Sequence, residues 1–183
     1  MPEPSPSTPS DLELVNRFRR FNDHPAFDRL VERHQGWVRG LCARMLRSDE
    51  LAKDAAQEVF TRALAHLGHW RGDNFPGWLK AIAVNCALTI IEREKRWAPL
   101  EPAPDLPSPA RDPEQLLLSE ETAVRARAVI ARLPEKQRIV FVMKHIDGCS
   151  YDDIARLTGF TAKEVKSFLQ NARRNFSHWW TAE

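Results

Sequence analysis

Aromatic and basic side chains are interleaved between residues 69 and 85, in the stretch HWRGDNFPGWLKAIAVN. Three aromatic residues, two cations and one amide stand out in it: Trp70, Phe75, Trp78, Arg71, Lys80 and Asn85. Aromatic faces can stack on unpaired bases, cations can pair with phosphates, and an amide can hydrogen-bond the edge of a flipped base. The segment therefore predicts a surface that binds single-stranded nucleic acid.

Core packing is the alternative explanation for the same aromatic residues. Trp78 stands four residues before Ile82, which is the spacing of one buried helical face, and this favours packing of Trp78 in the core. The pattern leaves both interpretations open for Trp70 and Phe75. The two cations and the amide do not suit a core, so the nucleic-acid role is favoured for them.

A second pattern lies in SYDDIARLTGFTAKEVKSFLQNARRNF, residues 150–176. Ser150 with Asp153, and Thr161 with Glu164, each have the form of a helix N-cap followed three residues later by an acid. Gly159 between them suits a tight turn, and the apolar residues are spaced to bury one face of two short helices. The segment predicts a helix-turn-helix motif, with an ordinary helical hairpin as the alternative.

The surrounding sequence predicts an all-α protein made of two small helical domains. Apolar residues recur at helical spacing before and after residue 48, and a further helix is expected from about Pro76 to Arg96. Six prolines occur between Pro99 and Pro113, which excludes a helix there and favours an extended linker. We expect a mostly disordered tail at 1–20, helical domains at 21–97 and 119–183, and a flexible linker at 98–118.

Composition restricts the class of protein. No apolar run reaches the roughly 20 residues of a membrane span, and no secretory leader is evident, so we expect a soluble cytoplasmic protein without membrane insertion. Cys42, Cys86 and Cys149 lie far apart without a CxxC pair, which favours buried thiols over disulfides or a metal site. No phosphate-binding glycine loop or nucleophile elbow is present, so neither an enzyme nor a cofactor is expected.

The ordered motifs resemble those of the extracytoplasmic-function (ECF) sigma factors, the minimal two-domain type of bacterial transcription initiation factor. The similarity rests on AFDRLVERH, DAAQEVFTRAL, WRGDNFPGWLKAIAVN and EREKRW in the first domain, and on LPEKQRIVF and DGCSYDDIARLTGFTAKEVKS in the second. The resemblance implies that the first domain binds the clamp helices of RNA polymerase and reads a melted minus-ten promoter element. The second domain would then place a recognition helix in the major groove at the minus-thirty-five element.

The resemblance also assigns roles to polar residues on two helices. On the recognition helix the polar face comprises Lys163, Lys166, Ser167, Gln170, Asn171, Arg173 and Arg174. Gln170 and Asn171 could read adenine edges in the major groove. The helix departs from the family, which commonly has other residues where this chain has Lys163, Glu164, Phe168 and Asn171. Phe168 would belong to the core or contact a partner.

The segment DAAQEVF is similar to the helix with which the family binds polymerase. Asp54, Gln57 and Glu58 share one face across a turn and would meet basic residues on the clamp, although a solvated charged face is the alternative. The implied partners are core RNA polymerase, promoter DNA and an anti-sigma factor. No metal or cofactor is implied.

Two other functions compete with a sigma factor. A stand-alone DNA-binding regulator would use the helix-turn-helix but leave residues 69–85 and the DAAQEVF helix without a role. An adaptor that binds an anti-sigma factor without initiating transcription would fit the atypical recognition helix. Stimulation of core polymerase in a purified transcription assay separates the first of these from a sigma factor.

Overall fold

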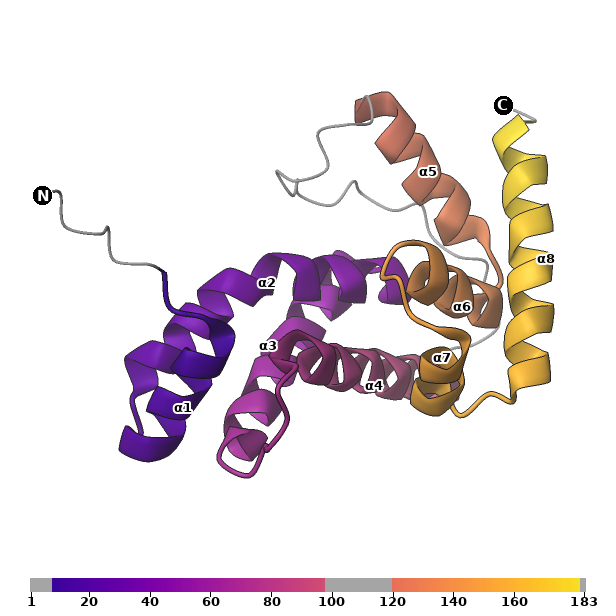
Figure 1. The fold of residues 1–183 in the computed structure, drawn as a ribbon. Coiled ribbons are helices and arrows are strands. Elements are labelled where there is room, and N and C mark those ends of the chain that lie inside the picture. The colour runs from indigo at the N-terminus through magenta and orange to yellow at the C-terminus, as the bar shows by residue number, and fades with distance from the viewer. Residues whose placement is uncertain (1–7, 98–119, 182–183) are drawn as a thin grey trace, which may run out of the picture.

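The structure is a computed structural model that describes residues 8–97 and 120–181. Over these residues the chain forms eight α-helices and no strand, which confirms the predicted all-α class (Figure 1). The expected linker at 98–118 lies outside the described residues. We refer to residues 8–97 as the first unit and to residues 120–181 as the second unit.

The first helix, α1 (Asp11–Phe21), corrects the expected extent of the N-terminal tail. Ser10 caps this helix in a reciprocal box with Glu13, and the turns that follow bury Leu14, Val15 and Phe18. The expectation of a mostly disordered segment over residues 1–20 is therefore wrong for residues 11–20. An amphipathic face that packs on a neighbouring helix stabilises α1 despite the proline-rich sequence before it.

Three further helices complete the first unit: α2 (His24–Leu46), α3 (Asp49–Leu67) and α4 (Phe75–Trp97). Asp23 caps α2 and Ser48 caps α3, each by accepting a hydrogen bond from a backbone N–H in the first turn. The small residues Ala52, Ala55 and Ala63 on the buried face of α3 allow close packing between α2 and α4. The helix predicted from Pro76 begins one residue earlier.

The second unit contains α5 (Glu120–Arg132), α6 (Glu135–His145), α7 (Tyr151–Thr158) and α8 (Ala162–Thr181). Ser150 and Asp153 form the predicted capping box of α7. Gly159 ends α7 with φ of 72°, a left-handed conformation that glycine adopts without strain. The chain then turns directly into α8, so α7 and α8 form the predicted helix-turn-helix.

The two units touch where α7 packs against α4 and where α5 and α6 pack against α2 (Figure 1). Arg138 of α6 is only 4% exposed and donates to the carbonyl oxygen of Met45 from two guanidinium nitrogens, at 3.0 and 3.3 Å. Met45 lies in the last turn of α2, where carbonyl groups lack partners within the helix. Burial lowers the pKa of Arg138 to about 10, which still leaves it charged at neutral pH.

A second group of contacts joins the loop between α6 and α7 to the first unit. Asp147 Oδ1 accepts from Arg44 Nη2 at 3.1 Å, and the Asp147 carbonyl oxygen accepts from Lys80 Nζ at 2.7 Å. Arg47 Nη2 also donates to the carbonyl oxygen of Leu133 at 2.6 Å. We call these bonds, with those of Arg138, the inter-unit contact. Charged groups hydrogen-bonded to backbone carbonyls form much of it.

Candidate nucleic-acid interface

The loop between α3 and α4, residues 68–74, leads into a capped helix start. The Asn74 side chain accepts from the backbone N–H of Gly77 at 2.9 Å, so Asn74 acts as the N-cap of α4, with Pro76 in the first turn. A Cβ atom on Gly77 would lie only 2.7 Å from the Asn74 amide, so glycine permits this close cap. Sequence reasoning missed Asn74, although an asparagine two residues before a proline is a recognisable signal of a helix start.

Three aromatic rings form one cluster at this helix start: Trp70, Phe75 and Trp78. The centroid of the Phe75 ring lies 6.0 Å from that of Trp70 and 5.7 Å from that of Trp78, and the two tryptophan rings are 5.6 Å apart. Phe75 is only 1% exposed, whereas Trp70 and Trp78 are half-buried. Phe75 is therefore the buried floor of the aromatic cluster. In this arrangement the two tryptophans alone expose part of their rings.

The two predicted cations, Arg71 and Lys80, bond to different parts of the molecule. Arg71 is exposed and donates to the carbonyl oxygens of Gly68 and Trp70, at 2.8 and 3.0 Å, which holds its charge beside the cluster. Lys80 instead reaches the second unit through Asp147.

Asn85 is exposed on α4, seven residues after Trp78, so both lie on nearly the same side of the helix. Lys80 is five residues before Asn85, which corresponds to a rotation of roughly 140° about the helix axis. Trp70, Arg71 and Trp78 thus lie together, Asn85 faces nearly the same side of α4 about two turns further on, and Lys80 is bonded to the second unit.

The recognition helix, α8, starts with a capping box that explains one departure from the family pattern. Glu164 Oε2 accepts from both the hydroxyl and the backbone N–H of Thr161, at 2.7 and 2.8 Å, while Thr161 Oγ1 accepts from the backbone N–H of Glu164 at 3.2 Å. The hydrogen bonds from Thr161 lower the pKa of Glu164. The carboxylate is thus held at the start of the helix and satisfies its first turn.

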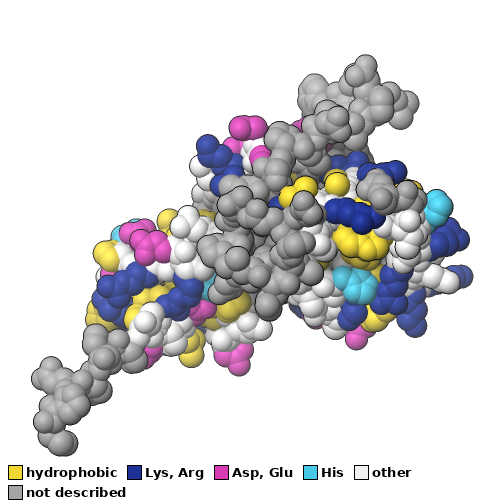
Figure 2. All heavy atoms as spheres, turned by 90° about the horizontal axis from the view of Figure 1, so that it is seen from above, with side chains coloured by type: hydrophobic (Ala, Val, Ile, Leu, Met, Phe, Trp, Pro, Cys, Tyr) yellow, Lys and Arg dark blue, Asp and Glu magenta, His cyan; other side chains and the backbone are white. Residues whose placement is uncertain are grey.

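All seven residues predicted for DNA binding on α8 lie on one side of it. With roughly 100° per residue, they fall within an arc of about 160°. Six are exposed and Asn171 is half-buried, while Val165, Leu169 and Ala172 on the opposite side are buried. Figure 2 shows Lys and Arg side chains gathered at the end of the molecule formed by α8. The geometry suits a helix that enters a groove of duplex DNA.

Phe168 packs against the core, which is one of the two alternatives left open for it, whereas the contact of Arg173 was not predicted. The Phe168 ring packs edge-on against Phe160 with centroids 5.3 Å apart, and Lys136 Nζ lies 5.7 Å from both ring centroids. Phe168 therefore stabilises the turn of the helix-turn-helix. Arg173 Nε donates to His145 Nε2 at 3.2 Å, and burial, followed by the charges of Arg173 and Lys144, lowers the pKa of His145.

The outer face of α3 carries the predicted polymerase-binding residues. Asp54, Gln57 and Glu58 are all exposed, while Ala55 and Val59 on the other face are buried. Glu58 pairs with Arg62 one turn later at 2.6 Å. This face offers polar groups to a partner, because nothing in the described part of the chain covers them.

Cys42, Cys86 and Cys149 are all buried thiols, as predicted, and burial raises the pKa of Cys42 to about 12. Residues 8–97 and 120–181 contain no group of three or more His, Cys, Asp or Glu side chains that could hold a metal ion. Over the same residues no helix is long and apolar enough to span a membrane.

Comparison with known proteins accounts for both units. Residues 30–97 match the family model of Sigma-70 region 2, and residues 123–176 match that of Sigma-70, region 4. The RNA polymerase sigma-H factor of Pseudomonas aeruginosa is 33% identical over 180 residues, which cover 89% of this chain and 90% of the relative. The ECF RNA polymerase sigma-E factor of Escherichia coli (strain K12) is 32% identical over 175 residues, which cover 90% of this chain and 91% of the relative.

Solved structures share the fold. The structure of CnrH in complex with the cytosolic domain of CnrY aligns with a TM-score of 0.60 at 22% identity, covering 94% of this chain and 98% of the other. The sigma factor RpoE from Bartonella quintana, in complex with the anti-sigma factor NepR, aligns with a TM-score of 0.64 at 18% identity. The alignment covers 86% of this chain and 98% of the other.

Two matched regions in the expected order and relatives aligned over most of their length define the class of protein. The chain belongs to the ECF-type sigma factors of the Sigma-70 family. It is a DNA-binding initiation factor that directs RNA polymerase to promoters.

Proposed function

We propose that the first unit reads a melted minus-ten element and that α8 reads a duplex minus-thirty-five element. The observation that carries this proposal is the exposed polar arc of α8, whose opposite side is held in the core by Val165, Leu169 and Ala172. Gln170 offers an amide that can pair with adenine in the major groove. Lys166 and Arg174 offer charge to phosphates, which fixes position without reading sequence.

In the first unit, Trp70 and Trp78 stack on unpaired bases while Asn85 hydrogen-bonds one flipped base. Their half-exposed rings and the exposed amide on the same side of α4 support this assignment. Arg71, held beside the rings, supplies a sequence-independent contact to the strand. Phe75 acts indirectly, because it is the buried ring against which both tryptophans pack.

We further propose that Asp54, Gln57 and Glu58 form the contact with core polymerase and that an anti-sigma factor regulates the chain. The first proposal is supported by the exposed polar face of α3, and the second by the similar fold of a sigma factor solved with the anti-sigma factor NepR. The chain has no catalytic role of its own in this scheme and works in the cytoplasm with polymerase.

The experiment that tests the reading of DNA by α8 compares two substitutions in the complex with core polymerase. Gln170→Ala should cost roughly 1–3 kcal/mol at one base pair of the minus-thirty-five element and relax specificity there. Lys166→Ala should weaken binding to all promoters alike and lower the salt dependence by about one counterion. Unchanged base preference and salt dependence in both variants would show that α8 does not read the duplex.

A further inference from the structure

A buried histidine connects the N-terminal helix to the aromatic cluster. His34 of α2 is 6% exposed, and both nitrogens of its ring have partners. Nε2 lies 2.9 Å from Asp11 Oδ2, and Nδ1 lies 2.9 Å from Trp37 Nε1. An indole nitrogen can only donate, so Nδ1 of His34 accepts. The proton of the neutral ring is therefore on Nε2 and is donated to Asp11.

Asp11 is itself held in place by α2 and by its own helix start. Its other oxygen, Oδ1, accepts from Arg33 Nη1 at 2.5 Å, and Arg33 Nη2 donates to the carbonyl oxygen of Pro9 at 2.8 Å. The carboxylate lies in the first turn of α1, where the helix dipole favours negative charge. Asp11 therefore fixes both α1 and the orientation of the His34 ring.

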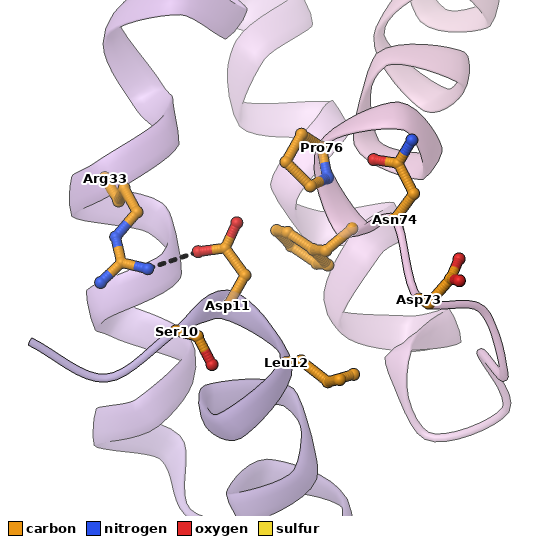
Figure 3. A pocket seen from close by; sticks show the side chains of 8 residues that line it. Ser10, Asp11, Leu12, Arg33, Asp73, Asn74 and Pro76 are labelled. Atoms are coloured by element: carbon orange, nitrogen blue, oxygen red, sulfur yellow. Dashed lines mark hydrogen bonds and ion pairs between the residues drawn. The ribbon is translucent and has the colours of Figure 1, made fainter.

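The other side of the histidine meets the start of α4. The centroid of the His34 ring lies 5.4 Å from that of Phe75, the floor of the aromatic cluster. Asp11 and Arg33 line one side of a pocket, and Asp73, Asn74 and Pro76 at the start of α4 line the other side (Figure 3). A continuous series of contacts thus runs from α1 through His34 to Phe75 and on to both tryptophans.

We propose that Asp11 and His34 are positioning residues that set the aromatic cluster for base reading. This inference rests on the proposed role of the cluster at the minus-ten element. The hydrogen bond from His34 to Asp11 fixes the plane of the imidazole. The imidazole in turn fixes the position of the Phe75 ring, against which Trp70 and Trp78 pack. Neither Asp11 nor His34 touches DNA. The N-terminal helix, which precedes the region 2 match at residues 30–97, thereby takes part in promoter selectivity.

The test compares Asp11→Ala with Glu13→Ala in full-length protein bound to core polymerase. Both substitutions remove an acid from the first turn of α1, but Glu13 hydrogen-bonds to Ser10 and not to His34, whose ring nitrogens bond to Asp11 and Trp37. The readout is open-complex formation on a matched promoter relative to promoters with single substitutions in the minus-ten element. Asp11→Ala should lower this base preference roughly 3- to 10-fold, the scale of one lost hydrogen bond, with affinity for core polymerase unchanged.

Glu13→Ala should keep the base preference of the wild type, and Asp11→Asn should restore most of it, because its amide oxygen still accepts from His34. Nitrogen NMR of the His34 ring adds a direct readout: the wild type should carry the proton on Nε2. Full base preference in folded Asp11→Ala, or a proton on Nδ1 in the wild type, overturns the proposal. If the wild type shows no base preference at all, the proposed minus-ten role fails instead.

Discussion

Asn85 offers an exposed amide on the side of α4 that also carries Trp78. We expect Asn85→Ala to lose roughly 1–3 kcal/mol of preference for one base of the minus-ten element, because a bidentate amide contact has that value. Helix content should not change, since the side chain is exposed. Open-complex formation on promoters substituted one base at a time measures the effect.

Arg71→Ala is the matched control for Asn85→Ala, because it removes a charge from the same site without removing an amide. Arg71→Ala should weaken binding to all promoters alike and make that binding less dependent on salt concentration. If Asn85→Ala keeps the full base preference, the amide does not read a base, and residues 68–85 serve as a structural corner.

His145 provides a prediction for the dependence of stability on pH. Its pKa in the folded chain lies below the ordinary value of 6.5, through burial and then through Arg173 and Lys144. The unfolded chain therefore takes up the proton first as pH falls. The contribution of His145 to stability is full above 6.5 and is lost as pH falls below that value toward the folded pKa.

Urea unfolding of the wild type and of His145→Gln at pH 7.5 and pH 5.5 measures this contribution. The glutamine variant should lose less stability between the two pH values, because it has no imidazole to protonate while it can still accept from Arg173. An identical loss in both proteins would contradict the assignment.

At the scale of elements, the start of α8 depends on one capping box. Thr161→Ala removes the hydroxyl that bonds both the backbone and the carboxylate of Glu164, and should lower the free energy of unfolding by roughly 0.5–2 kcal/mol. Ser150→Ala, which removes the equivalent hydroxyl from α7, is the matched comparison. Thermal unfolding of the two variants should show similar losses, and only Thr161→Ala should also weaken binding of duplex DNA. Unchanged stability in Thr161→Ala would mean that solvent replaces the cap.

Periodicity and capping signals predicted most of the helices. The apolar spacing and the cap residues predicted the helices before and after residue 48 and the helix-turn-helix, because these signals are local. The same signals were present in α1, where Ser10 and Glu13 form a box, but the prolines before them suggested a tail. Local signals could not show that Phe75 is buried, because both core and surface positions accept an aromatic residue at a helix start.

Long-range contacts explain the remaining differences at the candidate site. Lys80 is predicted to contact DNA, and in the free chain it donates to the carbonyl oxygen of Asp147, 67 residues away in the sequence. The bond from His34 to Asp11 likewise joins residues 23 positions apart. Such contacts depend on how helices pack, and no motif within either helix encodes them.

At the scale of the whole molecule, the inter-unit contact limits how far apart on DNA the two units can bind. Minus-ten and minus-thirty-five elements are separated by roughly 25 base pairs, or about 85 Å of duplex at 3.4 Å per pair. A compact chain of this length has a radius of gyration of roughly 16 Å. We therefore expect the two units to separate when both elements are bound at once, which would release Lys80 from Asp147.

Arg44→Ala should favour this separation in the free protein. It leaves the carboxylate of Asp147 without its charged partner, while burial already raises the pKa of that group. Small-angle scattering should give a larger radius of gyration for Arg44→Ala than for the wild type. Arg39→Ala, which removes an exposed arginine from the same helix, is the control and should scatter like the wild type. Equal radii in all three proteins would show that the Arg44–Asp147 pair does not hold the units together.

The most direct test of promoter-directed initiation is transcription by purified core polymerase with and without the chain. The readout is the set of RNA 5′ ends produced from a mixture of genomic DNA fragments. With the wild type, we expect discrete 5′ ends whose upstream sequences share two elements at minus-ten and minus-thirty-five. Glu58→Lys should reduce these transcripts by reversing charge on the exposed face of α3, whereas Glu32→Lys, on an exposed position of α2, should not. If core polymerase with the wild type yields no promoter-dependent 5′ ends at low salt, the chain does not direct initiation.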